Sequence, residues 1–526
     1  MLDFSKLKLV KRSKDSFVGI RKSSTGEELE FYLPNGFEDF PSENFDEIKN
    51  LFFRMYRTFR KFERDNIGKR RLKVNETKFP RDRDLMIFSS SEGISLKLGE
   101  SECILYSKIK MLEHILEAYD ELAINSIQKK NRSSEEIDYS QIHRYLDRAI
   151  YLDNDVVYMD SMELPRPSVK YESTDLINLY CYILDEIVQQ LDGDVAENII
   201  LRLQDIQFLA QHFRDDYLTI NQSIFDRDTF HETIIVLKEA LDSIDRNTYY
   251  KDSDYWQLYE AIEIFLYGEI NFDQTDGDFW GISNFSMLWE DMCNVFFFNN
   301  YYDDILYADT DIPLKSKPNL GKDSAGQSRI GNYSTHSASN PYNQQIYRTI
   351  SDVPYPNQKD SFWWNELLCI ELDLKPGTFA YQNERYSNFS KRDRSTTEFR
   401  RFPNPDLIIK NGINNSEVKI IDYKNVSLSF YTHSNSSEKY IDDTTKQLTY
   451  ELAVQQTHKV SGNWFFIPYF YVSDPNPFPL YELDLNLFCL GEIATEVKNL
   501  NGNTTGIKVF KANFLLIQKV YLDENS

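Results

Sequence analysis

The chain has 526 residues, of which 41% are hydrophobic, and its formal net charge is −24 at pH 7. This length allows about two to four domains, and the hydrophobic content is ordinary for a globular protein. The strong acidity argues against indiscriminate binding to nucleic acids, because affinity for DNA comes largely from Lys and Arg side chains that neutralise phosphates.

Two further classes are disfavoured by local patterns. The five cysteines are scattered without a Cys-x-x-Cys pair, which argues against a zinc ribbon or an iron–sulfur cluster and favours buried, reduced thiols. The first 20 residues have no apolar core of a signal peptide, and no stretch approaches the roughly 18 apolar residues of a membrane span. We therefore expect a soluble protein of the cytoplasm that makes no membrane contact.

Residues 1–100 are predicted to form a small α/β segment with a basic patch. Positions 17–18 and 29–33 have the character of short strands, and residues 45–64 have helical spacing. From Arg54 to Arg83 the chain carries twelve Lys or Arg against four acids, in a protein that is otherwise acidic. This patch is either a phosphate-contacting surface or a solvated basic helix that pairs with acidic neighbours. Its candidate DNA-binding residues are Arg54, Arg57, Lys61, Arg64, Arg70 and Arg71.

Residues 101–270 are predicted to form a helical domain that serves as a partner-docking arm. Apolar residues recur with helical spacing over 109–127, 176–191, 195–213, 223–244 and 255–265. Such stripes are usually core positions, so we expect packing and partner contacts from this segment.

Residues 271–526 are predicted to form the domain that carries the chemistry, with a flexible loop inserted around residues 315–345. A strongly apolar helix is expected over 285–296, and Glu290 within it is conspicuous because a charge in that setting needs a partner. Strands are expected over 464–468 and 509–517, and a helix over 444–455.

The most informative feature is a pair of acids and a lysine on two adjacent predicted strands. Asp406 opens an apolar run, and Asp422 and Lys424 end the next one, with Asn411-Gly412 as the predicted turn between them. Because side chains alternate faces along a strand, Asp422 and Lys424 point to the same side. Two carboxylates, the backbone carbonyl of Tyr423 and waters could hold Mg²⁺.

Such a site fits the needs of phosphodiester hydrolysis. A carboxylate-held Mg²⁺ makes a water nucleophilic near neutral pH and neutralises charge that develops on the phosphate. Lys424 would orient that water or stabilise the charge. Further along, Gln447, Tyr450 and Glu451 fall on one face of the predicted helix and could present a polar edge to the metal or to the substrate. The alternative interpretation is a surface hairpin with exposed charges and a solvated helix face.

In this arrangement the chain resembles PD-(D/E)xK nucleases. Asp406 matches the first acid, Asp422 the second and Lys424 the lysine, and Gln447 lies in a helix similar to the Gln-bearing motif of the RecB and McrC groups. Gln447 and Tyr450 are three positions apart where four is typical. Over about residues 280–526 the likeness is greatest to McrC-like subunits and LlaJI-type restriction endonucleases.

The resemblance implies an α/β (α+β) restriction-endonuclease-like domain with a mixed central sheet flanked by helices. It also implies a glutamate ahead of the first acid as a further metal contact, for which Glu290 and Glu366 compete. Mg²⁺ is the implied cofactor, and Mn²⁺ is expected to substitute. A basic stretch ahead of Asp406 is the candidate grip on the DNA phosphates, or else a loop that neutralises acidic surroundings: Lys391, Arg392, Arg394, Arg400 and Arg401.

The resemblance further implies a cleavage subunit that acts on double-stranded DNA in a nucleotide-driven restriction or antiphage complex. The chain has no Gly-x-x-x-x-Gly-Lys-[Ser/Thr] loop, so we expect a separate McrB-like AAA+ motor that hydrolyses GTP or ATP, in a hetero-oligomer. Two alternatives stay open: a catalytically inactive nuclease-fold adaptor that regulates a motor NTPase, and a stand-alone repair nuclease of the RecB type.

Overall fold

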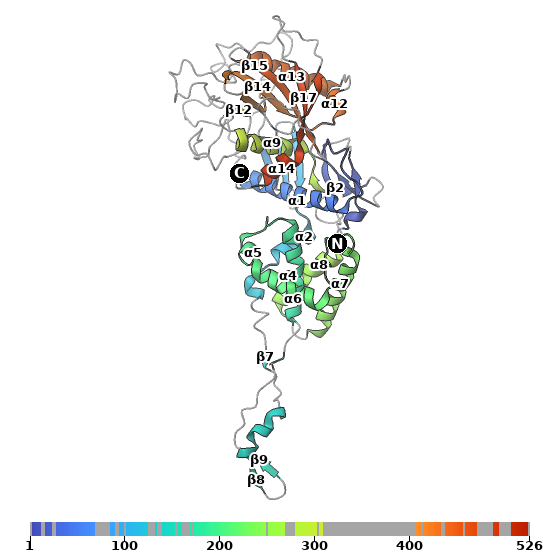
Figure 1. Cartoon of the computed structure of the whole chain (residues 1–526), viewed down its shortest axis with the longest axis vertical. Helices are drawn as coiled ribbons and strands as arrows, with labels where there is room; N and C mark the ends of the chain where they lie inside the picture. The colour runs from blue at the N-terminus through green and yellow to red at the C-terminus, as the bar shows by residue number, and fades with distance from the viewer. Residues whose placement is uncertain are drawn as a thin grey trace, which may run out of the picture. The chain divides into compact units, whose positions relative to one another are not determined.

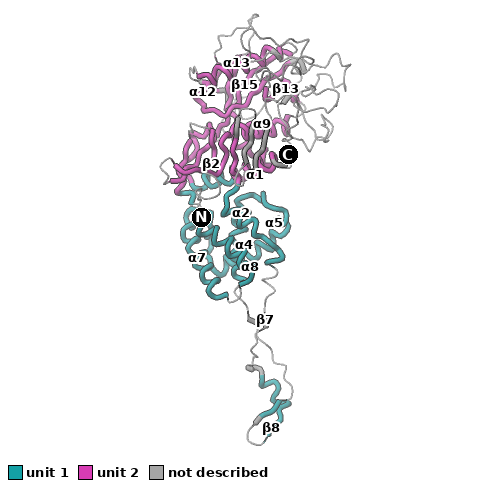
Figure 2. Tube along the Cα trace, turned by 180° about the vertical axis from the view of Figure 1, so that it is seen from behind, with its two compact units in different colours: residues 1–5, 45–53, 108–271 teal, residues 6–44, 54–107, 272–526 magenta. Residues whose placement is uncertain are grey.

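The computed structural model describes two compact units, drawn in different colours in Figure 2. Described residues are 3–11, 16–23, 28–68, 85–89, 94–98, 101–124, 132–133, 139–152, 156–159, 168–169, 173–248, 251–268, 279–301, 304–308, 405–411, 414–432, 437–455, 458–470, 488–493 and 506–523. Unit 1 comprises residues 1–5, 45–53 and 108–271, and unit 2 comprises residues 6–44, 54–107 and 272–526. The predicted domain boundaries at residues 100 and 270 stay a prediction.

Unit 1 is built mainly of helices (Figure 1). They are α2 (Lys110–Glu117), α4 (Ser173–Gln190), α5 (Glu197–Leu201), α6 (Leu203–Tyr217), α7 (Phe230–Asn247) and α8 (Ser253–Tyr267). Their apolar stripes are buried: in α4, for example, Leu179, Ile183 and Ile187 are all fully inaccessible. The helix predicted over 195–213 is divided at Arg202, whose φ of −113° and ψ of 14° leave the helical region. Burial of these stripes supplies the stability of the unit.

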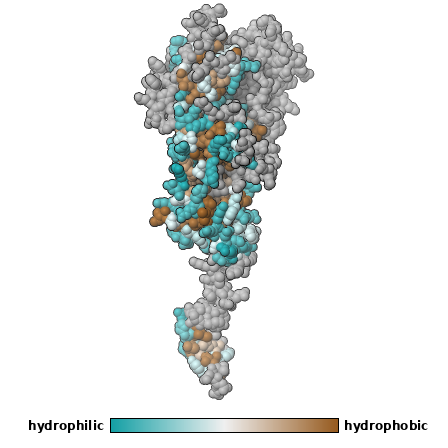
Figure 3. All heavy atoms as spheres, turned by 90° about the vertical axis from the view of Figure 1, so that its right-hand side faces the viewer, coloured by the Kyte–Doolittle hydropathy of each residue, from teal (hydrophilic) through white to brown (hydrophobic). Residues whose placement is uncertain are grey.

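A small segment of unit 1 keeps apolar side chains on its surface. It consists of η2 (Tyr139–Arg148), β8 (Ile150–Leu152) and β9 (Val156–Tyr158), which pair as an antiparallel ribbon. The exposed side chains are Leu146, Ile150, Tyr151, Leu152, Val157 and Tyr158. Figure 3 shows hydrophobic residues on the surface of this segment. Two strands are too few to bury a core of their own.

Unit 2 contains two mixed sheets, which makes it an α+β structure. The first has the strand order β1-β3-β2-β11-β6-β5-β4 and joins the N-terminal strands to β11 (Phe279–Ile282). Its other strands are β1 (Lys8–Val10), β2 (Val18–Lys22), β3 (Leu29–Tyr32), β4 (Leu85–Ser89), β5 (Ile94–Leu98) and β6 (Ser101–Tyr106). Helix α1 (Phe45–Gly68) contributes its residues from Arg54 onward to this unit, where Tyr56 and Phe59 contact the buried Trp280.

The second sheet of unit 2 has the order β12-β13-β14-β15-β17-β16. Its strands are β12 (Ile305–Ala308), β13 (Leu407–Asn411), β14 (Asn414–Tyr423), β15 (Lys459–Tyr469), β16 (Phe488–Ile493) and β17 (Ile507–Asn513). The neighbours β13 and β14 are antiparallel, whereas β14, β15 and β17 run parallel. The hydrophobic strand predicted over 464–468 is therefore the centre of this sheet.

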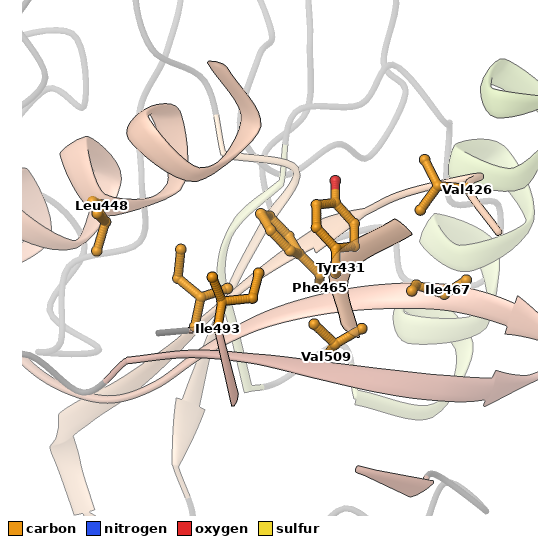
Figure 4. Packing of buried hydrophobic residues seen from close by; sticks show 8 residues of the cluster. Val426, Tyr431, Leu448, Phe465, Ile467, Ile493 and Val509 are labelled. Carbon is orange, nitrogen blue, oxygen red and sulfur yellow. The ribbon is translucent and has the colours of Figure 1, made fainter. Parts of the chain in front are cut away.

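Helices cover both faces of the second sheet. On one face, Phe297 of α9 (Phe285–Tyr301) contacts Tyr423 and Phe466, and the indole N–H of Trp289 donates to the Phe466 carbonyl at 3.4 Å. The other face carries α12 (Ser429–Thr432) and α13 (Glu438–Val454), which share a core cluster with the sheet (Figure 4). In that cluster the Tyr431 ring stacks on Phe465 at 4.7 Å between centroids.

The last predicted strand is correct only in its first half. Strand β17 ends at Asn513, and α14 (Phe514–Leu522) follows instead of further strand. The reason is local, because the Asn513 side chain accepts a hydrogen bond from the Leu516 N–H at 3.2 Å and so caps the new helix.

Candidate active site

The site is set by the pairing of β13 with β14. Leu407 lies opposite Ile421, so Asp406, directly before β13, lies beside Asp422 at the end of β14. The Tyr423 N–H donates to Asp406 Oδ2 at 2.7 Å, which fixes the orientation of that carboxyl. The structure thus brings together the two acids that are 16 positions apart in the sequence.

Asp422 and Lys424 lie on the same face of the sheet, as the alternation along the strand predicts. Lys424 Nζ lies 2.9 Å from Asp422 Oδ2, and the Lys424 N–H continues the ladder by donating to the Phe466 carbonyl at 2.8 Å. In the parallel register Asp422 is opposite Phe465, so this face is the one covered by α12 and α13. The hairpin is not a surface hairpin, because Asp406, Asp422 and Lys424 are all largely buried.

A fourth charged residue completes the cluster. Lys424 Nζ also lies 3.1 Å from Asp443 Oδ1 in the second turn of α13, and the Tyr431 hydroxyl donates to Asp443 Oδ2 at 2.7 Å. Neither Asp443 nor Tyr431 was predicted to be a site residue. The available signal was that Asp443 lies four positions before Gln447, so both share a face of one helix.

Burial and neighbouring charges shift the pKa values of the cluster. Burial raises the pKa of Asp422 well above its usual range, and the neighbouring Asp406 carboxyl raises it further. Burial alone would lower the pKa of Lys424, but the Asp422 and Asp443 carboxylates raise it well above its usual value. The ammonium therefore stays charged, and one ammonium faces three carboxyls in a site shielded from water.

Two carboxyl groups at this site could hold Mg²⁺. Asp406 and Asp422 present carboxylate oxygens from adjacent strands, and Mg²⁺ is commonly held through one or two carboxylates with waters completing its shell. Within the described ranges, no group of three or more His, Cys, Asp or Glu side chains has the arrangement of a metal-ion site.

Glu290 lies on α9, near the acids. Burial is the main cause of the raised pKa values of the Cys293 thiol and the Tyr423 hydroxyl, and the charges of Asp406 and Glu290 raise both further. The competing residue Glu366 lies outside the described residues. The choice between the two stays a prediction.

Gln447 is fully buried and faces β15. Its Nε2 donates to Asn463 Oδ1 at 2.5 Å, and Asn463 Nδ2 donates to Glu451 Oε2 at 2.9 Å. Gln447 Oε1 is buried and has no hydrogen-bond partner among the described residues. The predicted polar edge of the helix thus faces inward, and Asp443 of the same helix, outside this network, is the residue that reaches Lys424.

The predicted DNA-binding residues are only partly placed. Arg54, Arg57, Lys61 and Arg64 lie along α1, where Arg54 and Arg64 are exposed. Lys61 lies 4.0 Å from Asp65 and above the Tyr521 ring, so its ammonium already has partners. The remaining candidates lie outside the described residues, as does the predicted loop around 315–345: Arg70, Arg71, Lys391, Arg392, Arg394, Arg400 and Arg401.

A comparison of the chain with known protein families, curated proteins and solved structures found no match. The functional assignment therefore depends on the chemistry of the site. No helix within the described part of the chain is long and apolar enough to cross a membrane.

Proposed function

We propose that this protein is a metal-dependent DNA endonuclease of the PD-(D/E)xK kind, the cleavage subunit of an McrC-like or LlaJI-type restriction or antiphage complex. The observation that carries the proposal is the buried meeting of Asp406, Asp422 and Lys424 at the ends of two adjacent strands. The order acid, acid, x, lysine on a hairpin of a mixed sheet supports it.

Asp406 and Asp422 would hold Mg²⁺ or Mn²⁺, with the Tyr423 carbonyl and Glu290 as candidate further contacts. When bound, the cation supplies a water that is nucleophilic near neutral pH and neutralises charge on the phosphate. Lys424, kept protonated by two carboxylates, would orient the attacking water or stabilise the charge that develops on the phosphate oxygens.

The dependence on a motor subunit belongs to the same proposal. The sequence lacks a phosphate-binding loop of the Gly-x-x-x-x-Gly-Lys-[Ser/Thr] type, so nucleotide hydrolysis would come from a separate AAA+ GTPase or ATPase. Cytoplasmic location and hetero-oligomer formation follow from that role.

The test measures cleavage of double-stranded DNA by the purified protein with a candidate motor subunit, its nucleotide and Mg²⁺. Asp422→Ala and Lys424→Ala are expected to lose at least about 100-fold in rate, because the first removes a proposed metal ligand and the second removes the ammonium that would act on the water or the phosphate. Asp442→Asn is the matched control, since Asp442 is exposed and next to the site residue Asp443.

Each other outcome selects a different function. Unchanged cleavage by Asp422→Ala and Lys424→Ala would rule out this active site. Wild-type protein that stimulates the motor but cuts no DNA, with both variants equally stimulating, would identify a non-catalytic adaptor. Cleavage by the wild type without any motor would identify a stand-alone nuclease.

A further inference from the structure

Lys424 has two carboxylate partners, of which only Asp422 is a candidate metal ligand. Asp422 belongs to β14, whereas Asp443 belongs to α13, which packs on the sheet through Leu448. The two Nζ–oxygen distances, 2.9 Å and 3.1 Å, are nearly equal, so the ammonium is shared between the two acids.

The Asp443 carboxylate is itself held in place. One of its oxygens accepts from Lys424, and the other accepts from the Tyr431 hydroxyl at 2.7 Å. Tyr431 is buried, and its ring stacks on Phe465 in the cluster drawn in Figure 4. Asp443 therefore has a fixed position that does not depend on Asp422.

A cation on Asp422 changes the balance between the two partners. The Asp422 Oδ2 atom that accepts from Lys424 belongs to the carboxylate that would bind the cation, and a divalent ion there would repel the ammonium. A buried ammonium is costly without an anionic partner, so Lys424 then needs a second carboxylate.

We propose that Asp443 is a positioning residue that holds the Lys424 ammonium in the site when Asp422 takes up a divalent cation. This inference depends on the proposed function, because it assumes that Asp422 is a metal ligand. By accepting the ammonium, Asp443 keeps Lys424 from competing for Asp422 and leaves it beside the reacting phosphate.

The test measures Mn²⁺ affinity of the full-length protein without DNA, by counting free Mn²⁺ with electron paramagnetic resonance. The variants are Asp443→Asn, Asp443→Glu, Lys424→Met and the double variant Asp443→Asn with Lys424→Met. Asp442→Asn is the control for loss of a nearby surface charge, and circular dichroism checks that each variant is folded.

Asp443→Asn is expected to weaken Mn²⁺ binding by about 10-fold or more, which is the size of loss seen when residues that support metal ligands are replaced. In this variant the Lys424 ammonium would have only Asp422 to pair with and would compete with the ion. Lys424→Met is expected to restore the affinity in the double variant, and Asp443→Glu to preserve most of it.

Three results would overturn the proposal in distinguishable ways. Unchanged Mn²⁺ affinity in Asp443→Asn would show that Lys424 needs no second partner. An equal loss in the Lys424→Met background would show that Asp443 acts on the metal directly or only on the fold. If the wild type itself binds no Mn²⁺, the metal-dependent function fails along with this inference, whereas the first two results leave that function standing.

Discussion

The side chain of Asn35 donates to Asn425, the residue that follows Lys424, across 390 positions of the sequence. Asn35 Nδ2 lies 3.1 Å from Asn425 Oδ1 and 3.3 Å from the Asn425 carbonyl. Two residues of the N-terminal segment, Phe37 and Phe40, also pack on Phe470, which directly follows β15. The N-terminal segment thus helps to fix the chain just beyond the candidate active site.

Replacing Asn35 by Ala is expected to lower the cleavage rate strongly while it lowers the free energy of unfolding only modestly. The loss of two hydrogen bonds at a half-buried site costs about 1 to 2 kcal/mol of unfolding free energy. The freed Asn425 would loosen the segment that carries Lys424, and small displacements near a reacting group reduce rates strongly. Chemical denaturation and DNA cleavage measure the two effects, with exposed Ser42→Ala as the control. Equal rates in Asn35→Ala and wild type would refute the link to the site.

Gly36, the next residue, has no room for a side chain. Its φ is +85°, and a Cβ atom there would lie 1.9 Å from the Pro468 carbonyl oxygen. Gly36→Ala is therefore expected to destabilise the protein by about 3 kcal/mol or more, from backbone strain and overlap together. Gly193→Ala is the matched control: its φ is +75°, but a Cβ there meets no atom within 4 Å, so only the strain of about 1 kcal/mol is expected. Thermal unfolding of both variants measures the difference, and equal losses would contradict the overlap.

The sequence predicts much of the local structure because apolar residues recur with the period of the helix or strand that they form. The predicted strand that contains Asp422 appears as β14, and the helical stripe of 176–191 appears as α4. Asp406, Asp422 and Lys424 could be grouped in advance because a tight hairpin joins their strands and fixes which side chains face the same way.

Contacts between distant segments could not be predicted in this way. Asn35 has no local pattern that links it to Asn425, and Tyr431 lies in a four-residue helix without a periodic signal. The predicted strand over 509–517 missed the change to helix at Asn513, because an apolar run of that length suits either state. The role of Asp443 depends on where α13 packs, which is a tertiary property.

The network of Gln447, Asn463 and Glu451 is expected to be strongly coupled. Asn463→Leu would remove the hydrogen-bond partner that Asn463 provides to Gln447 Nε2 and to Glu451 Oε2 inside the protein, at a cost of about 2 to 3 kcal/mol. Adding Gln447→Met removes one of these buried polar groups, so the double variant should lose at least about 1 kcal/mol less than the sum of the single losses.

Equilibrium unfolding in urea measures this cycle. Lys459→Met, on the same strand, is the control because its ion pair with Glu417 is exposed to solvent and is expected to contribute little to stability. Strictly additive losses for Gln447→Met and Asn463→Leu would show that the network is not cooperative.

His458 is expected to make the protein acid-sensitive. Burial lowers its pKa below the usual 6.5, so between pH 6.5 and that lower value the unfolded chain binds a proton that the folded chain does not. Stability is therefore lost as pH falls below about 6.5. His458→Gln should flatten the fall in Tm between pH 7.5 and 5.5, whereas exposed His212→Gln should leave the slope unchanged. An identical slope in wild type and His458→Gln would contradict this account.

Divalent cations are expected to stabilise the folded protein through Asp422. A ligand that binds only the folded state adds about 2.7 kcal/mol at a concentration of 100 times its Kd. Addition of Mn²⁺ or Mg²⁺ should therefore raise the Tm of the wild type, and a chelator should reverse the rise.

Asp422→Asn should abolish this rise in Tm. Its Tm without metal need not fall, because Asp406 no longer faces a second acid. The rise on metal addition, rather than the Tm itself, is thus the informative quantity. Asp442→Asn should retain the full rise, and a rise that persists in Asp422→Asn would place the bound cation elsewhere.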